Sequence, residues 1–168
     1  AGAGGFINIS QNAKRVVFVG TFTAGGLQLA VEDGRLHIER EGRERKFVRA
    51  VEHRTYSGPV AAARGQPALY VTERCVFELG AAGLVLTEVA PGIDIERDIL
   101  AHMDFAPLIP QPPRPMDARI FLPATMGLRA QLLELPLEQR FTYDPAQNLF
   151  FINFEGYHVA RPEQIEAI

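Results

Sequence analysis

KRVVFVG, at residues 14–20, sets the expected fold class of this 168-residue chain. Its core is a short apolar run, rich in β-branched residues and ended by Gly20. Such a run is typical of a strand buried on both faces, as in a parallel sheet with helices packed against it. The stretch therefore predicts an α/β fold with a mainly parallel sheet.

Hairpins are expected beside this strand. Residues 27–31 and 36–38 alternate apolar with polar side chains, and they flank Asp33-Gly34. Type I′ turns need positive φ at both central positions, which this pair tolerates. We therefore predict a β-hairpin centred on residues 33–34.

The apolar patterns predict further elements up to residue 106. A short helix is expected from Pro59 to Gly65, with proline early and glycine after its end. Asp94 is the expected N-cap of a second helix, whose buried face repeats every fourth residue. Strands are expected at residues 47–51, 69–72, 75–79 and 84–89, where 69–79 forms either one strand or two.

Five prolines between residues 107 and 115 mark the expected domain boundary, because neither a helix nor a central strand tolerates that density. The predicted organisation is a lobe at 1–106, a proline-rich linker and end of the lobe at 107–121, and a small, partial α+β extension at 122–168. In the extension we expect a helix near residues 128–135 and a strand pair around Asp144-Pro145. The glycine-rich start and a short helical pattern at 162–168 suggest a piece of a larger chain.

Composition excludes several classes of protein. A net charge of −3 argues against binding nucleic acid through bulk charge, and a single cysteine excludes a disulfide framework or a cysteine-rich zinc site. No apolar run is long enough to span a membrane. The lone cysteine and the absence of a secretory signal predict a cytoplasmic location. Residues 35–54 carry seven basic and four acidic groups. This segment is either a solvated hairpin or a surface for a phosphate-bearing ligand or an acidic partner.

The glycine-rich opening, Gly2-Ala3-Gly4-Gly5, is the most suggestive element for chemistry. Without Cβ atoms, its backbone N–H groups can converge on an anion or a carbonyl oxygen. A tight turn or a cloning remnant would have the same composition. No strand precedes it at the right spacing for a dinucleotide-binding fingerprint.

Other candidate groups favour structural roles. Cys75 begins an apolar strand, so we expect a small core residue rather than a nucleophile. Glu73 and Arg74 are expected in a satisfied turn or an interface salt bridge, rather than as a catalytic acid and its partner. No metal site is expected, because the histidines have no metal-ligand spacing. They are His37, His53, His102 and His158.

Several motifs together resemble the carboxyl-terminal lobe of the glutamate-dependent (family I) CoA-transferases of the acetate, propionate and 3-oxoacid type. The motifs, in order, are AGAGGFINIS (1–10), KRVVFVGTFTAGG (14–26), YVTERCVF (70–77), APGID (90–94) and DILAHMDF (98–105). The resemblance extends to about residue 121. Residues 122–168 are similar to an extension found in longer members.

The resemblance implies an enzyme that moves CoA between an acyl-CoA and a small carboxylate through a glutamyl-CoA intermediate. The family's nucleophilic glutamate lies upstream of the glycine segment, so no catalytic residue is assigned within this chain, and the chain alone is expected to be inactive. The substrate-binding residues carried over from the family are Gly2, Ala3, Gly4, Gly5 and Phe6.

The resemblance also implies partners and setting. CoA would be a substrate and no cofactor is expected. The missing amino-terminal lobe would be a partner, and a homo-oligomer working in short-chain fatty acid or ketone body metabolism is expected. No nucleic acid or membrane partner is expected. The competing interpretation is a non-catalytic module for acyl-CoA binding or assembly.

Overall fold

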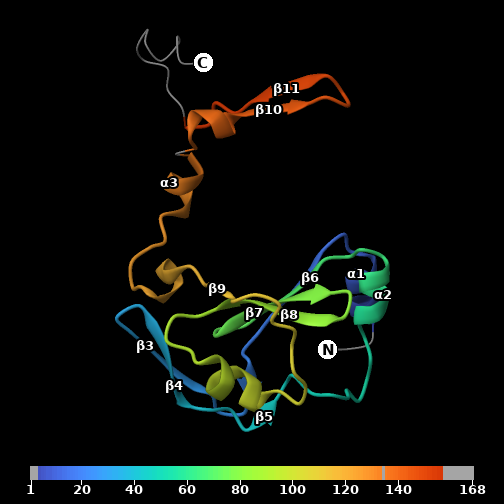
Figure 1. Ribbon diagram of the computed structural model, residues 1–168, viewed down its shortest axis with the longest axis vertical. Coiled ribbons are helices and arrows are strands. Elements are labelled where there is room, and N and C mark those ends of the chain that lie inside the picture. Colours follow the sequence, from blue (N-terminus) through green and yellow to red (C-terminus); the bar gives the residue numbers. More distant parts are fainter. Residues whose placement is uncertain (1–3, 134, 157–168) are drawn as a thin grey trace. The chain divides into compact units, whose positions relative to one another are not determined.

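The computed structural model describes residues 4–133 and 135–156, in two compact units, Ala1–Ala124 and Thr125–Ile168 (Figure 1). The division falls a few residues after the proline-rich stretch. No helix within the described ranges is both long and apolar enough to cross a membrane.

The first unit contains a five-stranded sheet in the order β1-β6-β7-β8-β9, two small two-stranded sheets and short helices. Its elements are α1 (Gly5–Asn12), β1 (Val16–Val19), β2 (Thr23–Ala24), β3 (Gln28–Glu32), β4 (Arg35–Arg40), β5 (Glu44–Arg45), α2 (Gly58–Ala63), β6 (Ala68–Val71), β7 (Cys75–Gly80), β8 (Gly83–Val89), a π-helical turn (Ile95–Ile99), a 3₁₀ turn (Leu100–His102), β9 (Arg114–Pro115) and a second 3₁₀ turn (Ala118–Phe121).

The sheet combines parallel and antiparallel pairs. β1 pairs with β6 and β8 with β9 in parallel, whereas β6–β7 and β7–β8 are antiparallel. Helix α2 makes the crossover between β1 and β6, as parallel neighbours require. The expected α/β architecture with hairpins is confirmed, and residues 69–79 form two strands.

The prediction that residues 16–19 are buried on both faces is wrong. β1 is a strand, but it lies at the end of the strand order. The side chains of Val17 and Val19 are 50% and 78% exposed, whereas Phe18 is half-buried on the opposite face. An apolar run predicts that a strand forms, but the burial of its side chains depends on which other elements pack beside it and against its two faces.

The β3–β4 hairpin forms as predicted. Asp33 and Gly34 have φ of 51° and 73°, the left-handed pair that a type I′ turn needs. Leu29 and Ile38 are cross-strand partners, and the buried Leu36 donates its N–H to the carbonyl oxygen of Pro91 at 2.7 Å. The hairpin is thereby attached to the turn that follows β8.

The predicted strand at residues 47–51 does not form. Phe47 packs with its ring centroid 4.8 Å from Phe22 and 5.1 Å from Phe77, in the core cluster that also contains Ile99 and Met103. Residues 48–51 then run without strand pairing. A local β pattern is not enough where no neighbouring strand offers hydrogen bonds.

The helix predicted after Asp94 does not form as one regular α-helix, although its predicted N-cap does. The Asp94 carboxylate accepts a hydrogen bond from the Arg97 N–H at 2.8 Å, which confirms the N-cap. The residues that follow form the π-helical and 3₁₀ turns, and they bury Ile99 and Met103 beside Phe77.

The proline-rich stretch runs along β8. Leu108 exchanges backbone hydrogen bonds with Leu84 and Leu86 at 2.8 and 2.9 Å, and Met116 donates its N–H to Val89 at 2.9 Å. β9 is only two residues long and lies at the sheet edge, where proline is tolerated. These residues therefore form an edge of the sheet.

The second unit contains α3 (Leu128–Leu133), a 3₁₀ turn (Leu137–Arg140) and the hairpin of β10 (Phe141–Asp144) and β11 (Leu149–Ile152). The predicted strand pair is confirmed. The guanidinium of Arg140, only 4% exposed, donates to four backbone carbonyl oxygens, those of Leu133, Leu135, Asn153 and Glu155. The helix predicted at 162–168 lies outside the described residues.

Candidate functional site

The predicted substrate-binding segment leads into α1. Gly2 and Ala3 lie outside the described residues. Gly4 is the N-cap position of α1, and Gly5 and Phe6 lie in its first turn. Within the part of the chain that the structure describes, no side chain caps the helix, and a Cβ at Gly4 would have nothing within 4 Å. The amide groups at this end are therefore accessible to an acceptor.

Phe6 connects this helix to the face of the sheet. Its ring centroid lies 6.3 Å from that of Phe18 on β1. Phe18 stacks on Tyr70 of β6 at 4.9 Å and meets Tyr56 edge-on at 5.1 Å. The aromatic cluster thus extends from the start of α1 across the two parallel strands.

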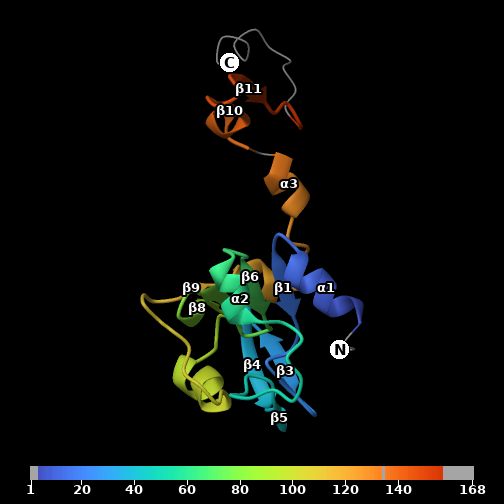
Figure 2. The same ribbon diagram turned by 90° about the vertical axis from the view of Figure 1, so that its right-hand side faces the viewer.

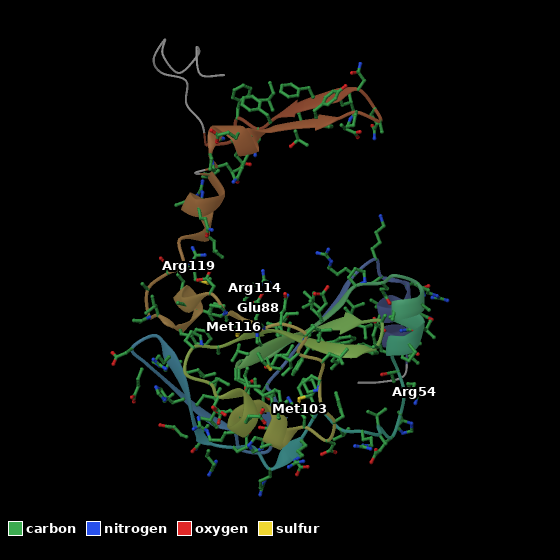
Figure 3. The ribbon with its side chains drawn as sticks, viewed as in Figure 1. Arg54, Glu88, Met103, Arg114, Met116 and Arg119 are labelled. Carbon is green, nitrogen blue, oxygen red and sulfur yellow. The ribbon has the colours of Figure 1, made fainter. Side chains whose placement is uncertain are left out.

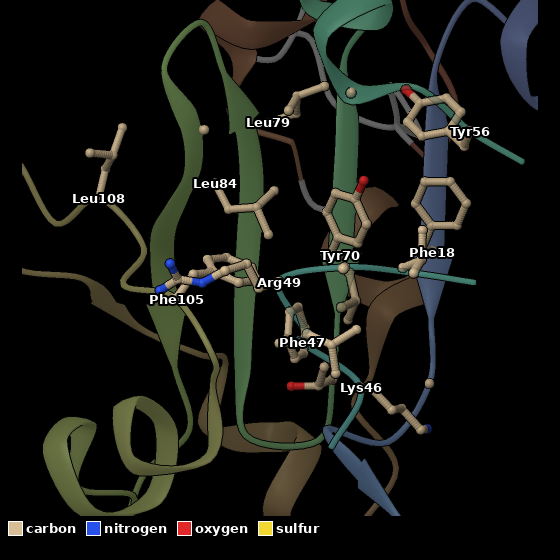
Figure 4. Close-up of a pocket in the computed structure, with 18 of the residues that line it drawn as sticks. Phe18, Lys46, Phe47, Arg49, Tyr56, Tyr70, Leu79, Leu84, Phe105 and Leu108 are labelled. Atoms are coloured by element: carbon tan, nitrogen blue, oxygen red, sulfur yellow. The ribbon is translucent and has the colours of Figure 1, made fainter. Parts of the chain in front are cut away.

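An open pocket of about 860 Å³ lies over Phe18, Tyr56 and Tyr70 of this cluster (Figure 4), whereas Phe6 is not among the residues that line it. It includes residues at and just after the ends of β1 and β6, where Val19-Gly20-Thr21 and Val71-Thr72 lie side by side. Crevices outside the carboxyl ends of parallel strands are the usual ligand sites of α/β sheets. The remaining wall comes from residues 46–51, Arg54, Tyr56, Gly58 and Pro59, together with Leu79, residues 82–84, and Phe105, Ala106 and Leu108.

Three cationic side chains line the pocket. The Lys46 ammonium donates to the backbone and hydroxyl oxygens of Thr21 at 2.8 and 2.7 Å, and Arg49 donates to the backbone oxygen of Asp104 at 3.3 Å. Arg54 has no hydrogen-bond or ion-pair partner among residues 4–133 and 135–156 (Figure 3). Desolvation raises the pKa of Tyr56 and Tyr70, so both phenols are neutral at pH 7.

The lining suits binding better than covalent chemistry. Aromatic rings and aliphatic side chains can enclose an apolar group, and the cations can attract an anion. No Asp, Glu, His, Cys or Ser is among the described residues that line the pocket. An acylated carboxylate would therefore have to come from outside this set.

The loop after β1, which contributes Gly20 and Thr21 to the pocket, is held by a buried ion network. Arg74 has a fully buried side chain and lies 4.7 Å over the ring of Phe22. It donates to Glu73 at 2.7 Å and to Glu41 at 2.7 and 3.1 Å. The second oxygen of Glu73 accepts the N–H of Phe22 at 2.8 Å.

Glu41 fixes the other side of that loop. Its carboxylate accepts hydrogen bonds from the Thr23 hydroxyl and the Gly42 N–H. Partial burial raises the pKa of Glu41, but the hydrogen bonds from Arg74 and Thr23 outweigh this and lower it to about 2. The structure therefore favours the satisfied turn predicted for Glu73 and Arg74.

Most of the remaining candidate residues have structural positions. Cys75 is fully buried, and desolvation raises the pKa of its thiol to about 12, which confirms a core residue. His37 is exposed on the hairpin, and His102 lies 3.5 Å from Glu41. No group of three or more metal-ligating side chains occurs among the described residues. His158 lies outside them.

Sequence reasoning missed most of the pocket. The predicted substrate-binding residue Phe6 contacts Phe18 but does not line the pocket. Residues 47–51 were expected to form a strand, and Phe18 and Tyr70 were expected simply within strands. The one available signal was the mixture of basic and apolar residues at 46–54. That pattern is typical of a segment that packs on one side and meets solvent or an anion on the other.

Comparison with known proteins supports one family, although no family model matches the chain. The chain is 48% identical over 126 residues to acetate CoA-transferase YdiF of Escherichia coli strains K12 and O157:H7, and 47% identical over 127 residues to caffeate CoA-transferase of Acetobacterium woodii. These matches cover 75–76% of this chain and 24% of each relative.

The fold agrees with the sequence match. Crystal structures of the E. coli O157:H7 acyl-CoA transferase YdiF, as a thioester complex with CoA and as apoenzyme, match with a TM-score of 0.72 at 48% identity. They cover 75% of this chain, which spans about a quarter of theirs. Over three quarters of its length, the chain is therefore similar to these CoA-transferases, in agreement with the resemblance of its sequence motifs.

Proposed function

We propose that this chain is part of an enzyme that moves CoA between an acyl-CoA and a free carboxylate, either short-chain or a 3-oxoacid. The observation that carries the proposal is 48% identity over 126 residues to a CoA-transferase, with a matching fold. The nucleophilic glutamate lies outside residues 1–168. The rest of the transferase is the partner that supplies it.

The proposed reaction has two symmetrical halves. The glutamate carboxylate attacks the thioester carbonyl, CoA thiolate leaves, and an acyl-glutamyl anhydride forms. The thiolate then attacks the glutamyl carbonyl and releases the first carboxylate, which leaves a glutamyl-CoA thioester. The second carboxylate reverses these steps. Covalent catalysis of this kind divides one difficult exchange into easier ones, and it uses CoA as a substrate without a further cofactor.

The contribution of this chain is to bind and to stabilise charge. Gly2, Ala3, Gly4, Gly5 and Phe6 would form one wall of the thioester site, and backbone N–H groups at the start of α1 would donate to the developing oxyanion. The uncapped helix end and the contact of Phe6 with Phe18 support this role. The enzyme is proposed to be a cytoplasmic homo-oligomer of short-chain fatty acid or ketone body metabolism.

An exchange assay tests the proposal. The isolated chain should give no transfer between acetyl-CoA and labelled carboxylates, because it lacks the nucleophile. A chimera in which this chain replaces the matching quarter of the E. coli acetate CoA-transferase should transfer CoA. It should also form a glutamyl-CoA thioester that borohydride or hydroxylamine traps. Trapping on a glutamate within residues 1–168 would contradict the assignment of the nucleophile.

The alternative is a non-catalytic acyl-CoA-binding or assembly module. One observation favours it: residues of this chain line the aromatic pocket, and Arg54 beside it has no partner among the described residues. Calorimetry with the isolated chain distinguishes the two. Micromolar affinity for CoA would support the binding module, since one wall of a divided site should bind weakly.

A further inference from the structure

Lys46 brings a cation to the pocket from outside the central sheet. It directly follows β5, which lies below α1 and α2 in both views of the first unit (Figures 1 and 2). Its ammonium reaches the loop after β1, where Thr21 accepts two hydrogen bonds from it (Figure 4). An ammonium has three N–H donors, so one is left for a ligand. No carboxylate among residues 4–133 and 135–156 forms an ion pair with Lys46, so its charge is not neutralised there.

Thr21 lies between two attachment points of the loop after β1. Gly20 donates its N–H to the carbonyl oxygen of Val71 on β6 at 3.1 Å. Phe22 donates its N–H to the Glu73 carboxylate, in the turn after β6, at 2.8 Å. The residues on both sides of Thr21 are therefore fixed, and this holds its carbonyl and hydroxyl oxygens within reach of Lys46.

Glu73 acts on this loop from outside the pocket. It is not among the residues that line the pocket, and its side chain is only 14% exposed. One carboxylate oxygen accepts the Phe22 N–H, and the other accepts the Arg74 Nε–H at 2.7 Å. A carboxylate only accepts hydrogen bonds, so it can satisfy both donors at once, whereas a side-chain amide can accept only through its single oxygen.

A lysine that is already held in place binds an anion better than a mobile one. The long side chain loses rotamer freedom when it is fixed, and this loss opposes binding if it occurs only when the ligand arrives. Here the contact with Thr21 fixes the ammonium of Lys46 before any ligand is bound. The position of Thr21 in turn depends on the hydrogen bond from Phe22 to Glu73.

We propose that Glu73 is a positioning residue, which acts through Thr21 to hold the Lys46 ammonium as an anion-binding group of the pocket. The inference rests on the proposed function, whose substrates carry two kinds of oxyanion, the phosphates of CoA and the carboxylate of the free acid. Lys46 would contact the oxyanion, whereas Glu73 contacts only the loop and its arginine partner.

A double-mutant cycle in the chimera with the E. coli acetate CoA-transferase tests this connection. Glu73→Gln keeps the shape of the side chain but cannot accept from both Phe22 and Arg74. Glu73→Gln and Lys46→Met should each raise the KM for the substrate whose oxyanion is bound by about tenfold, as expected for one charge-assisted hydrogen bond. The kcat should stay within about twofold, because the lost contact serves binding rather than the chemical step. The exposed-edge variant Glu88→Gln is the control and should change neither constant.

The double variant decides whether Glu73 acts through Lys46. If both changes remove the same contact, Glu73→Gln combined with Lys46→Met should raise KM by about tenfold, as each does alone. Independent effects would instead multiply to about a hundredfold. That result, or an unchanged KM in Glu73→Gln, would overturn the proposal.

The two substrates identify the oxyanion. If Lys46 binds a phosphate of CoA, the KM for acetyl-CoA and the dissociation constant of CoA should rise in Lys46→Met. If Lys46 binds the carboxylate of the acid, the KM for acetate should rise instead. Either pattern supports the proposal when the double variant is no worse than the single ones, and a rise in neither overturns it.

A second pair of variants leaves the buried ion network intact, in case Glu73→Gln does not fold. Thr21→Val removes the hydroxyl that accepts from Lys46, so it should raise the same KM by about threefold, as expected for one weak hydrogen bond. Thr21→Ser keeps the hydroxyl and should restore the original KM. Equal KM values in the two variants would overturn the proposal.

Binding separates this inference from the proposed function. An active chimera with additive variants would overturn the role of Glu73 alone. An inactive chimera would contradict the proposed function, and the same cycle of variants would then be read from the dissociation constants of CoA and acetate, measured by calorimetry. A chimera that binds neither CoA nor acetate would overturn both.

Discussion

At the scale of single residues, Arg74 connects several segments of the first unit. It is fully buried, and its guanidinium joins the turn after β6 to the loop before β5 and to the backbone oxygen of Asp98 at 2.7 Å. A buried charge is tolerated only when its hydrogen bonds are satisfied. The carboxylates of Glu41 and Glu73 therefore depend on Arg74 as much as it depends on them.

Replacing Arg74 should be severely destabilising. Arg74→Met leaves two largely buried carboxylates without their cation, and breaking one side of a buried pair costs about 3–5 kcal/mol. Urea denaturation of the isolated chain measures the loss. Arg114→Met is the control, because Arg114 is 75% exposed and pairs with Glu88 on the surface (Figure 3), where a pair contributes about 1 kcal/mol or less. Equal losses of unfolding free energy in Arg74→Met and Arg114→Met would show that burial of the Arg74 ion pairs does not matter.

Glu41 should make the free energy of unfolding depend on pH in the acidic range. Its pKa is lowered from 4.5 to about 2 in the folded chain. Its contribution is therefore complete above about pH 4.5 and is lost as the pH falls toward about 2. We expect the free energy of unfolding of Glu41→Gln to fall less steeply in this window than that of the unsubstituted chain. The exposed Glu39→Gln is the control, and an unchanged slope in Glu41→Gln would refute the expectation.

At the scale of elements, the β3–β4 hairpin depends on a close approach by the turn at Pro91-Gly92. Gly92 has φ of +94°, and a Cβ there would lie 2.5 Å from the carbonyl oxygen of Leu36. The carbonyl oxygen of Pro91 in this turn also accepts a hydrogen bond from the Leu36 N–H. Glycine is required at this position both for the backbone conformation and for the space.

Two glycine substitutions separate these requirements. Gly65 also has positive φ, +66°, but a Cβ there would meet nothing within 4 Å. Gly65→Ala should therefore cost about 1–2 kcal/mol for the left-handed backbone alone, whereas Gly92→Ala should cost about 2–5 kcal/mol because the hairpin must also move. Urea denaturation compares the two. A loss at Gly65 equal to that at Gly92 would show that the close approach to Leu36 does not matter.

At the scale of the whole molecule, each unit has its own stabilising centre. The first is built around two apolar clusters that include Phe77 and Leu36. The second is organised by Arg140 and by the stacking of Phe141 on Phe150, whose centroids lie 5.8 Å apart. The units should therefore unfold independently.

Shortening the chain tests this independence. A chain that ends at Ala124 should unfold cooperatively, with a midpoint within about 3 °C of the main transition of the full chain. Calorimetry provides the comparison, with Arg140→Met in the full chain as the matched perturbation of the second unit alone. Loss of the cooperative transition on shortening would show that residues 125–168 are needed to fold the first unit.

The amino-acid sequence by itself determined the features that depend on neighbours along the chain. The Asp33-Gly34 turn, the cap at Asp94 and most strands follow from local backbone preference and side-chain period. The resemblance to CoA-transferases followed from ordered motifs such as YVTERCVF at 70–77. The inert role of Cys75 also followed from its apolar surroundings.

Only the tertiary structure decided what depends on distant neighbours. Residues 16–19 have the composition of a central strand, yet β1 lies at the end of the strand order in the described sheet. The position of a strand in a sheet depends on which other segments pair with it. Residues 47–51 have a strand pattern but pack as a pocket wall, since no strand lies within reach of their backbone. The pocket itself brings Phe18, Tyr70 and Phe105 together from three separate segments. The spacing of apolar residues in the sequence shows which side of a helix or strand is apolar. The tertiary structure decides which other segments pack against that side.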